Sequence, residues 1–162
     1  MEILIPYDHT YFTVLNSWIT DENILFQYSG TSFIYPFTEK QLLVYQKKHP
    51  DRKFYIGLRQ DRTPFAFGEI VPQDSYTVRL ARILVGEVES RGKGLGESFI
   101  RALLLEARQH FRVLLVDLYV LSDNTAAIRC YTKAGFAFTD HEDIILTHKG
   151  TGHLIRRMSL RL

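Results

Sequence analysis

The sequence predicts a mixed α/β fold in which helices pack on a mostly antiparallel sheet. Three short runs at 52–58, 64–71 and 76–85 are rich in β-branched and aromatic residues and are separated by turn-forming segments. Because the links between them are short, the three runs predict antiparallel hairpins. Beyond them, helical and strand patterns alternate to the end of the chain.

Hydrophobic periodicity and capping residues predict the remaining elements. Segment 8–45 has an untidy helical pattern. Apolar side chains step along one stripe from 94 to 110, which predicts an amphipathic helix. A shorter helix is predicted at 124–134, with Asn124 as its N-cap and Gly135 after its end. Further strands are predicted at 113–121, 136–146 and 153–162.

Composition limits the classes of protein that this chain can form. Its 162 residues, 46% apolar and 23% charged, suit a single domain over 1–162. No run approaches the roughly 20 apolar residues of a membrane-spanning helix, and the first residues lack a signal-peptide pattern. We therefore expect no membrane partner and a cytoplasmic location. A net charge of +2 is too small for a nucleic-acid surface. Cys130 is the only cysteine, and the six histidines lack ligand spacing, so we expect neither a disulfide nor a metal.

A glycine-rich segment at 91–96 lies between a predicted strand and a predicted helix. Glycines permit a tight turn and close approach to a ligand, and free N–H groups at a helix N-terminus attract anions. The segment predicts either a phosphate-binding loop or only a tight turn. It is not a P-loop, because Gly94 stands where that motif needs Ser or Thr. Nor is it a dinucleotide fingerprint, because Glu97 replaces the third glycine.

Two motifs resemble those of the GNAT superfamily of N-acetyltransferases. The acetyl-CoA loop of that family reads Arg/Gln-x-x-Gly-x-Gly/Ala and is matched by Arg91, Gly94 and Gly96. The second motif is a strand, then Asn, then a helix ending in Tyr-x-x-x-Gly-Phe, which Asn124 and residues 131–136 match. The chain is loosely similar to the bacterial ribosomal-protein N-acetyltransferase branch, but its first fifty residues match the superfamily only in helical character.

The resemblance implies a GNAT-type fold with acetyl-CoA as cosubstrate. The sheet would have about six to seven strands, with a V-shaped opening where the strand ending at Val85 parts from the strand over 113–121. The pantetheine arm would pair with backbone in this opening, and loop N–H groups would wrap the pyrophosphate. Arg91 and Lys93 would add positive charge, unless both are simply solvated. The expected cofactor-binding residues are Leu84, Val85, Arg91, Gly92, Lys93, Gly94, Leu95, Gly96 and Asn124, the last of which has helix capping as an alternative role.

Acetyl transfer to an amine needs a proton for the departing thiolate and an acceptor for the amine proton. The resemblance places Tyr131 at the family's phenol position, where a group of pKa about 10 can protonate a thiolate of pKa about 8.5. A Tyr that merely packs in the core is the alternative. For the general base, the candidates are Glu69 inside an apolar strand, Glu87 just past a strand end, and a water relay. Asp117 also lies on a strand, where its placement favours a structural role.

The resemblance therefore implies an N-acetyltransferase in which a primary amine attacks acetyl-CoA directly in a ternary complex. The acceptor is open between a peptide N-terminus and a small amine, because the family binds its acceptor near the first helices, where the match is poorest. Aromatic residues gather in that region and either wall an acceptor pocket or form core. They are Trp18, Phe26, Tyr28, Phe33, Tyr35 and Phe37. The alternatives are an inactive acyl-CoA-binding sensor or scaffold and, on the loop's basic residues alone, a nucleic-acid-binding domain. Either a monomer or a homodimer is expected.

Overall fold

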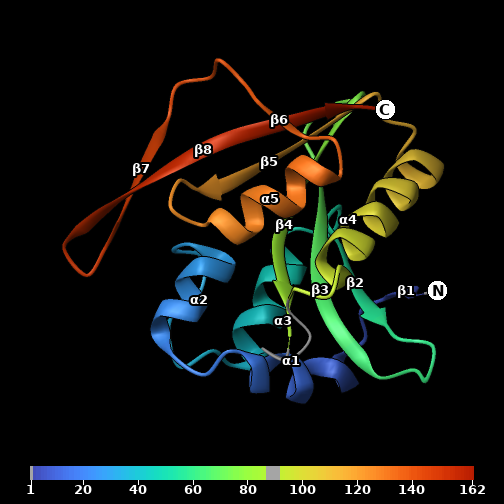
Figure 1. Cartoon of the computed structure of the whole chain (residues 1–162). Coiled ribbons are helices and arrows are strands. Elements are labelled where there is room, and N and C mark those ends of the chain that lie inside the picture. The colour runs from blue at the N-terminus through green and yellow to red at the C-terminus, as the bar shows by residue number, and fades with distance from the viewer. Residues whose placement is uncertain (1, 87–91) are drawn as a thin grey trace.

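One mixed sheet runs through the molecule in the order β1-β2-β3-β4-β5-β8-β6, with β7 paired to β8 (Figure 1). The computed structural model describes residues 2–86 and 92–162. Its strands are β1 (Ile3–Pro6), β2 (Lys53–Leu58), β3 (Pro64–Pro72), β4 (Thr77–Val85), β5 (Leu115–Leu121), β6 (Ala137–Phe138), β7 (Ile144–His148) and β8 (Thr151–Arg161). Within these residues every pairing is antiparallel except that of β4 with β5. The predicted hairpins and the mostly antiparallel sheet are confirmed.

Helices cover both faces of this sheet (Figure 1). The described helices are α1 (Phe12–Trp18), α2 (Glu22–Ser29), α3 (Glu39–Lys48), α4 (Leu95–Glu106) and α5 (Thr125–Lys133), with helical turns η1 (His9–Tyr11) and η3 (Ala107–Phe111). Side-chain oxygens of Asp21, Thr38 and Asn124 cap α2, α3 and α5 by accepting backbone N–H groups. The cap predicted at Asn124 is therefore present. No described helix is long and apolar enough to cross a membrane.

The sheet divides the hydrophobic core into two clusters. On one face, α4 and α5 contribute Phe99, Ile100 and Tyr131 to a cluster with β4 and β5. On the other face, the first three helices pack Leu15 and Leu42 against β2 and β3. Most of the aromatic residues near the N-terminus are core, as the second of the two readings of the sequence predicts. Trp18, Phe26, Tyr28, Phe33 and Phe37 are buried, whereas Tyr35 is exposed.

Three elements differ from the sequence prediction. The strand predicted at 136–146 is interrupted, because the polar residues 140–143 are exposed between β6 and β7. The helix predicted at 94–110 is α-helical only to Glu106 and continues as a π-helical turn. An additional edge strand, β1, pairs with β2 and brings the sheet to eight strands in the described chain. Four residues are too short a run for periodicity to identify.

The two central strands part as the V-shaped opening requires. β4 and β5 are paired only from Thr77 with Leu115 to Arg79 with Asp117, although both strands continue beyond this point. In Figure 1 their arrowheads point in different directions. A bulge bends β4 past the junction, because the register with β3 shifts there and Arg82 has a positive φ of 47°. The predicted opening between these strands is confirmed.

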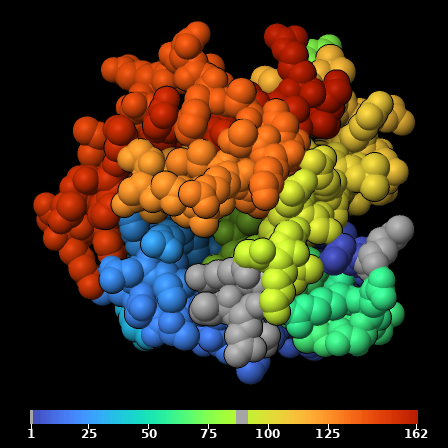
Figure 2. Space-filling view, viewed as in Figure 1, coloured from blue at the N-terminus to red at the C-terminus, as the bar shows by residue number. Residues whose placement is uncertain are grey.

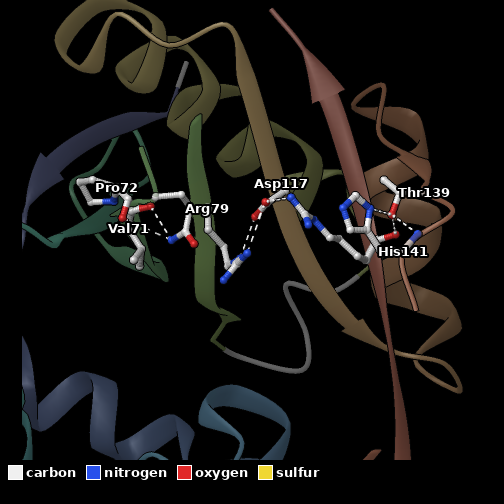
Figure 3. Close-up of polar contacts among 8 residues, drawn as sticks. Val71, Pro72, Arg79, Asp117, Thr139 and His141 are labelled. Atoms are coloured by element: carbon white, nitrogen blue, oxygen red, sulfur yellow. Dashed lines mark hydrogen bonds and ion pairs between the residues drawn. The ribbon is translucent and has the colours of Figure 1, made fainter. Parts of the chain in front are cut away.

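A buried ion cluster stands at the last rung before the strands part. Asp117 of β5 is buried, and its Oδ1 accepts from Arg79 Nε of β4 at 2.7 Å (Figure 3). Its Oδ2 accepts from Arg157 Nη2 of β8 at 2.6 Å. One carboxylate therefore holds three strands together, and the structural role predicted for Asp117 agrees with this placement.

Replacing Asp117 by Asn should destabilise the fold strongly, because two half-buried guanidiniums would lose their common anion. We expect Asp117→Asn to lower the free energy of unfolding by about 3 kcal/mol, measured by urea denaturation. Asp143→Asn is the matched control: its pair with Arg156 is long, at 3.7 Å, and exposed. The control should change the free energy of unfolding by less than about 0.5 kcal/mol. Equal effects in the two variants would contradict the role of Asp117 in holding the three strands together.

Candidate active site

The N-terminus of α4 has the backbone of an anion site. Gly94 is the N-cap, with a φ of 79° and no capping side chain, and Gly92 has a φ of 76°. A Cβ at either glycine would meet nothing within 4 Å. Left-handed glycines before a helix turn successive N–H groups toward one point, and these groups stay available when no side chain caps them. Lys93, between the two glycines, is exposed.

Three elements meet beside this turn. A Cβ on Gly96 would lie 3.3 Å from Cys130 Sγ of α5 and 3.5 Å from Val85 Cγ2 of β4. The absence of a side chain at Gly96 thus lets α4 approach both neighbours closely. Figure 2 shows the surface hollowed between α2, α4 and α5, with atoms in the olive-green of β4 visible in the recess.

The free edge of β4 presents backbone groups to the opening. Gly86 N–H donates to Phe65 O at 2.7 Å, so Gly86 faces β3. Because hydrogen-bonding directions alternate along a strand, Val85 turns its N–H and C=O toward the side from which β5 has departed. Leu84 is opposite Phe67 of β3 and is buried. Of the two residues expected near the pantetheine, Val85 thus has the backbone orientation that suits pairing.

Tyr131 lies on α5, on the face of the sheet covered by α4. It is buried and packs edge-on against Phe136, with ring centroids 6.2 Å apart. No described residue hydrogen-bonds its hydroxyl. Burial raises the pKa of Tyr131 well above its usual value, and the neighbouring Cys130 contributes in the same direction. The phenol is therefore a proton donor over the whole neutral range, as a general acid must be.

Asn124 stands where β5 passes into α5. Its Oδ1 accepts from Ala127 N–H at 3.2 Å, which is the capping hydrogen bond. The side-chain NH₂ group has no partner among the described residues. One amide oxygen is thus occupied by the cap, while the amide donors are available to a ligand.

A cavity of about 400 Å³ lies at the opening between the central strands. Leu80, Ala81 and Arg82 of β4 form one side, and Tyr119 to Leu121 of β5 form another. The remaining wall includes Phe26 and Tyr28 of α2, Arg52, Arg79 and, from the C-terminal hairpin, Leu146 and Ile155. These three arginines were not identified from the sequence, although basic residues inside the apolar run of β4 were a signal for Arg79 and Arg82.

The C-terminal hairpin completes this cavity by packing on α2. Phe26 stacks on His148, with ring centroids 4.3 Å apart and planes at 11°. Lys149 Nζ also lies 3.0 Å from Glu22 Oε2. The cavity wall therefore contains residues from the first third of the chain and from its C-terminal end. The aromatic residues Phe26 and Tyr28 are buried in the core and also line the cavity.

Glu69 is the centre of a buried polar network beside the cavity. It is fully buried on β3, where Oε1 accepts from the Tyr45 hydroxyl at 2.8 Å and Oε2 accepts from Arg82 Nη1 at 2.5 Å. Arg52 Nη1 donates to the same Tyr45 hydroxyl. Burial raises the pKa of Tyr45, with Glu69 adding to the rise, so the hydroxyl stays protonated and donates. Glu69 itself does not line the cavity.

Two residues predicted for the site, Arg91 and the alternative base Glu87, lie outside the described residues. Within the described part of the chain, no three His, Cys, Asp or Glu side chains gather as metal ligands. The structure brings Val85, Gly96 and α5 together, and it places Glu69 on the opposite side of the opening from Tyr131.

Comparison with known proteins identifies the fold and the family. The model of the acetyltransferase (GNAT) family matches residues 17–136. A crystal structure of spermidine N-acetyltransferase from Vibrio cholerae in complex with CoA and spermine superposes with a TM-score of 0.81 at 16% identity, covering 99% of this chain and 95% of that chain. A chimera of the Vibrio cholerae enzyme SpeG with hSSAT gives a TM-score of 0.79 at 14% identity, covering 99% and 95%. These similarities show a common fold. Because the family model matches most of its length, the chain belongs to the GNAT family and is an acetyl-CoA-dependent N-acetyltransferase.

Proposed function

We propose that the protein transfers the acetyl group of acetyl-CoA to a primary amine by direct attack in a ternary complex, with Tyr131 as general acid. The observation that carries this proposal is the parting of β4 and β5 after the rung of Arg79 and Asp117. The opening separates the glycine turn and Tyr131 on one face of the sheet from the cavity on the other. An acyl donor and an amine can therefore approach one another from opposite sides.

The residues around the glycine turn suit acetyl-CoA. N–H groups at the start of α4, from Gly92 to Gly96, would bind the pyrophosphate, with Lys93 and Arg91 adding charge. Val85, with Leu84 beside it, would pair with the pantetheine arm as an additional strand does with a free edge. The Asn124 amide NH₂ would donate to the same arm while its oxygen keeps the cap. Acetyl-CoA supplies an activated acetyl thioester to this site.

Tyr131 is the proposed proton donor to the leaving sulfur. As the amine nitrogen bonds to the acetyl carbon, the carbon–sulfur bond breaks, and Tyr131 donates its phenolic proton to the thiolate. Its lack of a hydrogen bond to any described residue leaves the hydroxyl available for this contact. The Val85 N–H, on the free edge of β4, would hold the thioester carbonyl oxygen, where negative charge develops.

Glu69 is the proposed acceptor of the amine proton. Neither Glu69 nor Tyr45, whose hydroxyl donates to Glu69 Oε1, lines the cavity, whereas Arg52 and Arg82, which contact them, do. Water that enters beside these arginines would carry the proton from the amine to the Tyr45 hydroxyl and on to Glu69. The acceptor class within this proposal is a peptide N-terminus or a small amine, and the cytoplasmic location and oligomeric state stay predictions from the sequence.

Removing the Tyr131 hydroxyl should slow catalysis without weakening cofactor binding. We expect Tyr131→Phe to lower kcat by about 100-fold or more, measured as thiol release from acetyl-CoA, and to leave the Kd for CoA unchanged. Because burial raises the pKa of this acid, wild-type kcat should show no loss of the donor up to about pH 10. Tyr76→Phe, at a residue 65% exposed, is the control. Unchanged kcat in Tyr131→Phe would remove Tyr131 from the mechanism.

A side chain at the glycine turn should weaken CoA binding specifically. Gly94 and Gly150 have nearly the same φ, 79° and 76°, and open space around an added Cβ. Alanine at either position should therefore cost a similar 1–2 kcal/mol of strain, roughly. We expect only Gly94→Ala to raise the Kd for CoA, by about tenfold, in isothermal titration. The same Kd in both variants would place the pyrophosphate elsewhere.

The relay to Glu69 predicts that two substitutions behave alike. Glu69→Gln and Tyr45→Phe should each lower kcat/KM by about 100-fold and abolish the same limb of the pH–rate profile. Circular dichroism melting of both variants gives the accompanying change in stability. If stability falls while the pH profile keeps its shape, Glu69 only holds Arg82 in place and the base is another group.

A further inference from the structure

The cavity is lined by cations and not by anions. Arg52, Arg79 and Arg82 form part of its wall, whereas no aspartate or glutamate does so among the residues that the structure describes. A guanidinium that is partly removed from water needs an anionic partner. The partners that each arginine already has therefore decide which ligand the cavity favours.

Arg52 brings an unbalanced charge to the wall. Its described polar contact is the Tyr45 hydroxyl, which is neutral. Among the described residues, no carboxylate lies within ion-pair distance of Arg52. Arg82, by contrast, is neutralised by Glu69, although its Nε is buried without a hydrogen-bond partner in the described structure.

Arg79 also belongs to a cluster with excess positive charge. It shares the single carboxylate of Asp117 with Arg157, so two guanidiniums face one anion. Its side chain is 24% exposed and lies over the Tyr119 ring, at 4.5 Å from the centroid. Both Arg79 and Tyr119 line the cavity. The ion cluster around Asp117 therefore has a net positive charge, and Arg79 presents part of that charge to the cavity.

A buried hydroxyl in the same wall has no partner. Tyr28 lines the cavity and is only 4% exposed, and its OH makes no hydrogen bond to a described residue. Burial raises the pKa of Tyr28 well above its usual value, so the group remains a donor. An unsatisfied buried donor is costly, and an oxygen of a bound ligand would satisfy it.

We propose that the acceptor is a small amine that carries a carboxylate, as an amino acid does, and that the arginine-lined cavity binds this carboxylate. The inference rests on the proposed function, since it names the acceptor class of the same site. The cavity volume of about 400 Å³ is in the range of small-molecule sites. Spermine, which is bound in the Vibrio cholerae neighbour, would instead place ammonium groups beside guanidiniums, and such like-charge contacts are unfavourable.

Matched amines that differ only in the carboxylate test this proposal. Thiol release would be measured at saturating acetyl-CoA for lysine against cadaverine, ornithine against putrescine, and phenylalanine against phenethylamine, with spermidine alongside. In the pair that the enzyme acetylates fastest, we expect kcat/KM to be about 10- to 100-fold higher for the amine with a carboxylate than for the amine without one. One charge-assisted hydrogen bond provides a difference of this size. Higher kcat/KM for the decarboxylated members, for spermidine, or for a neutral peptide with an amidated C-terminus would overturn the proposal.

Variants of the wall assign the preference to its residues. The ratio to follow is kcat/KM for the amine with a carboxylate divided by kcat/KM for its decarboxylated partner. Arg52→Gln should reduce this ratio to about 1–3, and Arg52→Lys should retain part of it. Tyr28→Phe, which removes an unpaired hydroxyl and so should fold normally, should lower the ratio several-fold, by about the value of one hydrogen bond. Arg108→Gln, the same charge change at an exposed residue away from the cavity, should leave the ratio unchanged. An equal effect of Arg52→Gln and Arg108→Gln would contradict binding by Arg52.

Direct binding separates this proposal from the proposed function. Absence of CoA binding, or of thiol release with every amine, counts against the acetyltransferase mechanism. In that case isothermal titration of lysine and cadaverine into the protein without CoA decides the acceptor proposal by itself. Tighter binding of lysine supports it, whereas tighter or equal binding of cadaverine, or no binding of either, overturns it.

Discussion

The separation of β4 from β5 is the constraint on which the rest of the structure depends. Two parallel neighbours in a sheet normally continue side by side, because each unpaired backbone group loses a hydrogen bond. Here the pairing stops at Arg79 and Asp117, and the backbone edge beyond it is free. The ion cluster at Asp117 fixes the point of separation, and the bulge at Arg82 bends β4 beyond it. The cavity, the free edge and the access to Tyr131 all follow from this one interruption.

The sequence could predict most of the fold because its strands and helices have strong local signals. Short links between apolar runs predict the β2–β4 hairpins, and Asn124 followed by an amphipathic segment predicts α5. Where local signals are weak, the prediction was wrong in detail: β1 is four residues long, and the polar run at 140–143 interrupts a strand whose flanks are apolar. The glycine turn could be predicted because positive φ values favour glycine, so the turn is visible in the sequence as a glycine-rich segment.

The acceptor side could not be predicted in the same way, since it depends on which distant side chains meet. Nothing local in the sequence shows that Arg52 donates to the Tyr45 hydroxyl, or that Arg79 and Arg157 both pair with the carboxylate of Asp117. A charge count over the chain gives nearly zero, whereas the charges around the cavity are far from balanced. Glu69 illustrates the same limit: the sequence shows an acid in an apolar strand, but not that its two oxygens accept from Tyr45 and Arg82.

The contact between α2 and the C-terminal hairpin links ligand binding to local stability. The wall near Leu146 and Ile155 stays in place through a small set of interactions, which include contacts of the Phe26 ring with His148 and His153 and an exposed ion pair of Lys149. Segments held by few contacts open locally at a lower free energy than the core. Any ligand that touches both walls binds only the closed form, so it slows hydrogen exchange of the hairpin amides by a factor that grows with the ratio of ligand concentration to Kd.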